Sequence, residues 1–340
     1  MRKIDIFTHI FPTPFYDLMM KVAPDLEDIG KRVRGVPMLA DLDERFRVMD
    51  LFDDYSQVLS LASPPIEALG GPDVAVDLAR AANDGMAELV GRYPDRFPGF
   101  VASLPMNHPD GLLAEAERAM AQLGACGVQV FSNVLGKPLV EPEFLPLFDL
   151  MAEADRPIWI HPARGASFPD YLTEDGSKFE IWWTFGWPYE TSAAMARIVF
   201  AGLFDTHPDL KIITHHMGGM VPYVAGRVGP GWDQLGSRTS DEDYTVVLDR
   251  LQRRPLDYFK MFYADTATFG AYPATECGLS FFGVDRVLFA SDSPFDPEHG
   301  AMYIRETIKI VDRLQLDEVA RDKIYRANAV RLLRLPDRWQ

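Results

Sequence analysis

Short runs of β-branched and aromatic residues alternate along the chain with longer stretches in which apolar residues recur every three or four positions. The short runs have the length and composition of buried strands. They predict eight strands: Lys3–Phe7, Gln57–Leu61, Phe100–Leu104, Gly127–Phe131, Ile158–His161, Lys211–His215, Phe262–Thr266 and Arg286–Ser291. The longer stretches predict helices over Leu42–Phe52, Val74–Tyr93, Asp110–Leu123, Glu143–Ala154, Glu190–Phe204, Ala301–Leu314 and Leu316–Leu335.

This alternation indicates parallel strands, because parallel neighbours need a long connection between them. Eight such units are the number in a closed (β/α)8 TIM barrel, which is the fold class we predict. An open doubly wound sheet is the alternative, but its first strand is usually followed by a glycine-rich turn, and Thr8–Pro14 contains no glycine. We expect a single domain over residues 1–340, with loop insertions around 162–188 and 217–243 at the carboxyl-end face.

Four of the seven histidines stand at or just beyond the end of a predicted strand: His9, His161, His215 and His216. Asp292 follows the eighth strand in the same way. The carboxyl ends of barrel strands converge on one mouth, and imidazole and carboxylate groups together are ligands for a divalent metal such as zinc. Because successive residues of a strand point to opposite faces, we expect only one of the adjacent pair His215 and His216 to face this mouth.

The chain carries 50 acidic and 34 basic residues, a net charge of −16. This balance argues against nucleic acid or an anionic membrane surface as the partner. Two cysteines, Cys126 and Cys277, cannot form a disulfide framework. We find neither a signal-peptide pattern nor a run of the ~20 apolar residues that a membrane helix needs. We therefore expect a cytoplasmic protein that acts on a small molecule.

Five segments spread over the chain resemble the amidohydrolase-related group that includes 2-amino-3-carboxymuconate-6-semialdehyde decarboxylase and γ-resorcylate decarboxylase. They are Ile4–Pro12, Ile160–Pro162, Gly186–Thr191, Gly202–Tyr223 and Asp285–Phe295, and Ala327-Asn328-Ala329 follows them. The resemblance implies a (β/α)8 barrel with one divalent metal, zinc or manganese, at its mouth. It implies that His9, His161 and Asp292 bind the metal. It also implies that His216, which precedes a Gly-Gly pair, activates the metal-bound water or assists protonation.

One position departs from the family pattern. The first strand of the family ends in His-x-His or Glu-x-His, whereas this chain has Phe7-Thr8-His9. Phe7 cannot bind a metal, and three alternatives follow. The site can operate with three protein ligands and water, which suffices for catalytic zinc. His216 can bind the metal directly. Metal binding can be weak or absent.

A divalent metal with an open position supports either hydrolysis or the decarboxylation of an acid with an adjacent hydroxyl group. Decarboxylation needs a proton donor, for which His216 and Asp292 are the candidates. The resemblance favours a metal-dependent, non-oxidative decarboxylase of a small aromatic or unsaturated carboxylic acid. The alternatives are a metal-dependent hydrolase or hydratase acting on a ring-derived acid, ester or lactone, and a ligand-binding barrel with a degenerate metal site.

Five aromatic residues crowd the segment Phe179–Trp187. They suit a planar substrate that stacks at the mouth, with Trp187 as a candidate substrate-binding residue, and they equally suit a dimer contact or a local core. Arg164 and Arg227 are candidates to pair with the substrate carboxylate, although either can instead pair with a surface acid. The substrate, the metal and the oligomeric state stay open; a homodimer would agree with the resemblance.

Overall fold

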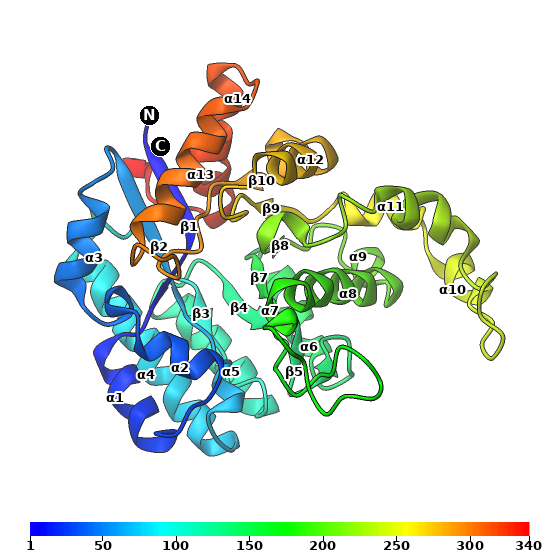
Figure 1. Ribbon diagram of the computed structural model, residues 1–340, viewed down its shortest axis with the longest axis horizontal. Coiled ribbons are helices and arrows are strands. Elements are labelled where there is room, and N and C mark those ends of the chain that lie inside the picture. Colours follow the sequence, from blue (N-terminus) through cyan, green and yellow to red (C-terminus); the bar gives the residue numbers. More distant parts are fainter. Residues whose placement is uncertain (340) are drawn as a thin grey trace.

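The computed structural model describes residues 1–339 and contains a ring of eight parallel strands with helices around it (Figure 1). The eight strands are β1 Lys3–Ile10, β2 Tyr55–Leu61, β3 Ala102–Ser103, β4 Val128–Phe131, β7 Ile158–His161, β8 Ile212–Thr214, β9 Tyr263–Asp265 and β10 Val287–Leu288. Two further strands, β5 Asn133–Val134 and β6 Lys137–Pro138, form a separate antiparallel hairpin. All eight predicted strands are present.

Backbone hydrogen bonds run around the whole ring. β1 pairs with β2, and β3, β4, β7, β8, β9 and β10 pair in that order. A parallel bridge joins Leu59 of β2 to Phe100, which precedes β3. Between β1 and the last strand, the amide of Ile6 donates to the carbonyl of Phe289 at 3.0 Å. The (β/α)8 barrel predicted from the alternation of strands and helices is confirmed.

Most of the helices cover the outside of the ring. They are α1 Thr13–Val22, α2 Ile29–Arg34, α3 Leu42–Met49, α4 Pro72–Arg92, α5 Pro109–Ala121, α6 Leu145–Glu153, α7 Ile181–Thr184, α8 Gly186–Phe200, α9 Leu203–Thr206, α10 Thr245–Arg250, α11 Pro255–Phe259, α12 Tyr272–Phe282, α13 Ala301–Arg313, α14 Glu318–Asp322 and α15 Asn328–Leu333. The predicted helix Glu190–Phe204 is divided into α8 and α9, because Gly202 adopts φ +76° between them. The sequence pattern did not predict α1, α2, α7, α10, α11 or α12.

The barrel interior is filled by apolar side chains from alternate strand positions. An irregularity in β1 changes this alternation, since one extra residue lies between Asp5 and Thr8 relative to the register of β2. Ile6 and Phe7 consequently both belong to the interior cluster. A bulge of this kind shifts the face that later residues present. His9, two residues after Phe7, is therefore directed to the barrel mouth.

The two segments predicted as insertions follow β7 and β8, at the carboxyl ends of the strands. The first is not entirely irregular, because it contains α7 and the start of α8. Beyond the second, α10 projects away from the barrel (Figure 1). Within residues 1–339, no helix combines the length and the apolar character needed to span a membrane.

Candidate metal centre and active site

Four buried side chains from different strands meet at the barrel mouth. His9, His161, His215 and Asp292 each present one ligand atom, and these atoms all lie within 4.8 Å of one another. His161 is the last residue of β7, His215 follows β8 directly, and Asp292 lies four residues beyond β10. The structure thus brings together the three side chains predicted to bind metal and adds His215. Their role as ligands stays a prediction.

Hydrogen bonds to main-chain carbonyls orient two of these imidazoles. Nδ1 of His161 lies 2.7 Å from the carbonyl oxygen of Pro162, and Nδ1 of His9 lies 3.2 Å from that of Leu61. Since a carbonyl only accepts, both Nδ1 atoms carry hydrogen, and Nε2 is the atom that each ring turns toward the cluster. Nε2 of His9 lies 2.9 Å from Oδ1 of Asp292, so both atoms are directed at the same point. The donor set fits a divalent metal.

Burial and mutual charge shift the ionisation of the cluster. Burial would raise the pKa of Asp292, but the charge of His215 and hydrogen bonds from the surrounding histidines hold it well below its usual range. Burial, reinforced by the charges of His215 and His9, lowers the pKa of His161 well below its usual value. Burial would also lower the pKa of His215, yet Asp265 and Asp292 raise it to about 9. Asp292 is therefore ionised and His161 neutral at pH 7.

The expectation that only one of His215 and His216 faces the mouth is wrong. Strict alternation requires a continuing strand, and β8 ends at Thr214. His216, Met217, Gly218 and Gly219 all have positive φ, which turns the chain back toward the barrel. The two imidazole centroids lie 3.7 Å apart, and Nε2 of His216 lies 3.5 Å from Oδ2 of Asp292. Both rings therefore face Asp292.

Phe7 lies inside this cluster rather than beside it. Its side chain is fully buried, and its ring centroid is 4.2 Å from that of His215, 5.0 Å from that of His9 and 5.8 Å from that of His161. The position at which the chain departs from the family pattern is thus an apolar wall of the site.

A cavity of about 500 Å³ opens above the cluster, and His161 and Asp292 line its floor. Six aromatic side chains form a large part of its wall: Trp182, Trp183, Trp187, Phe269, Phe295 and Tyr303. The ring centroid of Trp187 lies 5.2 Å from that of His161, so this predicted substrate-binding residue does lie at the site. Phe179 and Phe185 of the same segment point to solvent, with exposed fractions of 91% and 70%.

The two arginines expected to bind the substrate lie elsewhere. Arg164 forms an ion pair with Glu190 at 2.9 Å, and Arg227 is exposed at the start of the turn Arg227–Gly231; neither lines the cavity. The cations that do line it are Lys31 and Arg32 of α2, and no local pattern in the sequence marked them. The one available signal was the length of the connection between β1 and β2, since long loops at a barrel mouth often contact substrates.

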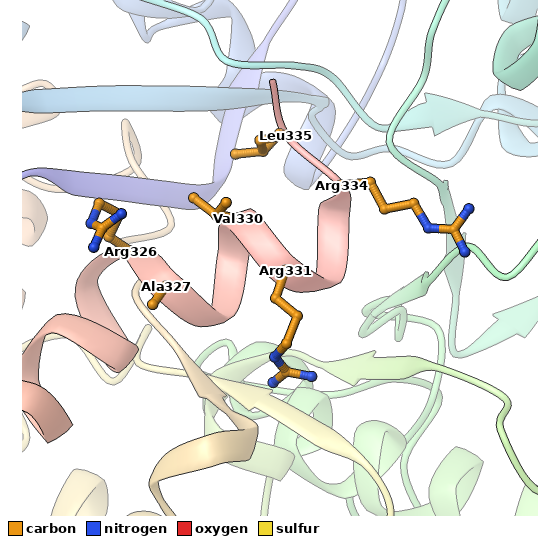
Figure 2. A pocket seen from close by; sticks show the side chains of 6 residues that line it. All are labelled: Arg326, Ala327, Val330, Arg331, Arg334 and Leu335. Atoms are coloured by element: carbon orange, nitrogen blue, oxygen red, sulfur yellow. The ribbon is translucent and has the colours of Figure 1, made fainter. Parts of the chain in front are cut away.

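A second hollow, of about 460 Å³, lies against α15 and is lined by Arg326, Arg331 and Arg334 (Figure 2). Figure 2 shows that the three guanidinium groups point away from one another. Arg326 pairs with Asp322, and Arg334 pairs with Asp155, which precedes β7. This hollow is therefore at the amino ends of the strands, remote from the histidine cluster, and its cations do not converge on one anion.

The closed ring and the cluster at its carboxyl ends define a (β/α)8 barrel of the kind that holds a divalent-metal centre. Residues 4–335 match the family model described as amidohydrolase, so the chain belongs to the amidohydrolase family, as the sequence resemblance implied.

Named relatives agree with this membership. γ-Resorcylate decarboxylase of Rhizobium radiobacter is 33% identical over 307 residues, which are 87% of this chain and 88% of that protein. The structure of a 2,6-dihydroxybenzoate decarboxylase with 2,6-dihydroxybenzoate is 27% identical, covers 98% of both chains and has a TM-score of 0.77. A dihydroxybenzoic acid decarboxylase of Polaromonas sp. JS666, solved with manganese and 2-nitroresorcinol, is 26% identical, covers 98% of this chain and 97% of its own, and has a TM-score of 0.77.

Proposed function

We propose that the protein is a metal-dependent, non-oxidative decarboxylase of a small aromatic acid that carries a hydroxyl group next to its carboxylate. It is a carboxy-lyase of the amidohydrolase family, like its named relatives. The observation that carries the proposal is the buried histidine and aspartate cluster at the floor of an aromatic cavity. Such walls suit a planar ring, and the cluster offers nitrogen and oxygen donors for a metal.

His9, His161 and Asp292 are the proposed metal ligands. When bound there, a divalent metal would hold the substrate carboxylate and its neighbouring hydroxyl group together and withdraw electrons from the ring. We propose zinc, because two imidazoles and one carboxylate are a common ligand set of catalytic zinc. Manganese is the alternative, and it is the metal in the solved Polaromonas relative.

His216 is the proposed proton donor, and Asp292 holds its ring in place at 3.5 Å. The His216 ring also contacts Phe269 of the cavity wall, at 5.1 Å between centroids. The proton passes to the ring carbon that bears the carboxylate. The bond between that carbon and the carboxylate then breaks, its electron pair restores the aromatic ring and CO₂ leaves. The reaction consumes one proton and needs no oxidant.

The substrate ring is proposed to lie against Trp183 and Trp187. Lys31 and Arg32, at the rim of the cavity, are proposed to balance its negative charge. Arg32 donates a hydrogen bond to the carbonyl of Phe295, which fixes one side of its guanidinium and leaves further N–H groups for an anion. They replace Arg164 and Arg227 in this role.

Three broader features belong to the same proposal. One domain carries the whole activity. The cytoplasm is the proposed location, and the free cysteines Cys126 and Cys277 agree with a reducing compartment. The exposed rings of Phe179 and Phe185 are the proposed contact surface of a homodimer.

Metal analysis and CO₂ release test the function together. We expect the purified protein to contain a divalent metal and to release CO₂ from hydroxybenzoates such as 2,6-dihydroxybenzoate. His161→Ala and Asp292→Ala should each lose metal and turnover, while His207→Ala, which changes a surface histidine, should retain both. Bound metal with ester or lactone cleavage and no CO₂ would identify a hydrolase. A protein with neither metal nor turnover would be a ligand-binding barrel.

A further inference from the structure

His215 presents an unused nitrogen to the metal cluster. Its side chain is fully buried, and within residues 1–339 its Nε2 makes no hydrogen bond. This atom lies 3.2 Å from Oδ1 of Asp292. Ligands about 2.1 Å from a tetrahedral ion are roughly 3.4 Å apart, so the spacing suits two ligands of one metal. A nitrogen and a carboxylate oxygen buried this close without hydrogen-bond geometry would both be satisfied by a cation between them.

The other edge of the same imidazole is held by a second carboxylate. Nδ1 of His215 donates a hydrogen bond to Oδ2 of the fully buried Asp265, so Nε2 is the nitrogen that remains for a metal. Oδ1 of Asp265 accepts hydrogen bonds from the backbone amides of His216 and Ala267, both at 3.0 Å. The main chain therefore fixes the carboxylate. A carboxylate behind an imidazole commonly orients histidines that bind metals.

Phe7 closes the side of the cluster on which β1 offers no donor. Its ring meets that of His215 nearly edge to face, with 76° between the ring planes. The contact restricts the imidazole of His215 to the direction of Asp292. Phe7 on β1 and His215 after β8 thus lie side by side in the cluster. Of the two side chains, only the imidazole of His215 can bind a cation.

We infer that His215 is a fourth protein ligand of the metal, and that it supplies from β8 the donor that Phe7 does not supply from β1. This rests on the proposed metal-dependent function. The ligand set becomes three imidazole nitrogens and one carboxylate oxygen. Imidazole suits zinc, whereas manganese favours oxygen ligands, so the same inference predicts selection of zinc over manganese.

Zinc affinity tests the inference without reference to turnover. Metal-free protein is titrated with zinc against a chromophoric chelator. His215→Gln should weaken zinc binding by at least about 100-fold, since even the loss of a group behind a ligand costs about 10- to 100-fold. The matched control is His207→Gln, which changes a surface histidine paired with Asp149 at 2.7 Å and should keep the wild-type affinity. Adding Phe7→His to His215→Gln returns a donor on β1 and should recover at least about tenfold.

A second measurement needs no variant. Proton NMR of the cobalt-loaded wild-type protein should show three paramagnetically shifted, exchangeable imidazole N–H signals, from His9, His161 and His215. Two such signals would overturn the inference. Unchanged zinc binding in folded His215→Gln would also overturn the inference. Tighter zinc binding would overturn it as well, because it would mean that His215 competes with the metal as a cation. If His215→Gln weakens zinc binding as expected but the wild-type protein releases no CO₂, only the proposed decarboxylation is refuted.

Discussion

Gly219→Ala tests whether the turn after β8 places His216 for catalysis. Gly219 adopts φ +62° and ψ −122°, the mirror image of the extended region, which residues with a Cβ atom adopt at a cost of about 1–3 kcal/mol. A Cβ there would lie 2.5 Å from the carbonyl oxygen of Pro188, well inside the 3.4 Å at which ordinary contact begins. Relieving such a clash costs a further 1–3 kcal/mol or so. We expect a total loss of about 4 kcal/mol in the free energy of unfolding.

The effect on function follows from what must move. The turn has to withdraw from α8, which weakens the 2.9 Å hydrogen bond from the amide of Met220 to Oγ of Ser192 and displaces His216. A displacement near 1 Å can cost about 100-fold in rate, so we expect kcat to fall by that factor while zinc stays bound. Denaturation, metal analysis and CO₂ release measure the three quantities. Gly226→Ala is the control, since Gly226 has helical φ and open space around it. Equal stability and activity of the two variants would refute the reasoning.

Three further predictions concern charge. Arg32→Gln should raise KM about tenfold with little change in kcat, because it removes one charged hydrogen bond to the substrate. Arg227→Gln is the control and should leave both constants unchanged. Steady-state kinetics measures both variants. Burial raises the pKa of Glu67 to about 7, so the folded state holds this proton more tightly than the unfolded chain and stability falls as pH rises from about 4.5 to 7. Glu67→Gln should remove that fall, which amounts to about 3 kcal/mol in the free energy of unfolding between pH 4.5 and pH 8. Denaturation of both proteins at the two pH values measures it. A difference in stability between the variant and the wild type that does not change with pH would contradict the prediction. Chelation should lower the melting temperature, and zinc should restore it.

Much of the fold was predictable because strands buried on both faces are continuous apolar runs. The predicted strand Ile158–His161 coincides with β7. The ends of parallel barrel strands share one face, so the meeting of His9, His161 and Asp292 followed from strand positions combined with the family resemblance. Neither step required knowledge of side-chain contacts.

The rest of the site depends on departures from regular structure. The bulge in β1 and the positive-φ turn at His216 both end the alternation on which periodicity relies. The two glycines after Met217 were a signal of such a turn, but they could not show that both His215 and His216 would face inward. Arg164 was predicted to bind the substrate because it lies three residues beyond His161 in the sequence. In the structure its guanidinium pairs with Glu190 instead.

Charge balance connects Phe7 with the rest of the centre. Asp265 and Asp292 are both buried, and without a compensating positive charge two carboxylates at this depth would each cost several kcal/mol. A divalent cation among neutral imidazoles cancels them. A glutamate at position 7 would add a third carboxylate and leave the centre negative even with metal bound. Because Phe7 adds no charge, the proposed anionic substrate would meet a neutral centre at the floor of a cavity that Lys31 and Arg32 line together with Asp28 and Glu180.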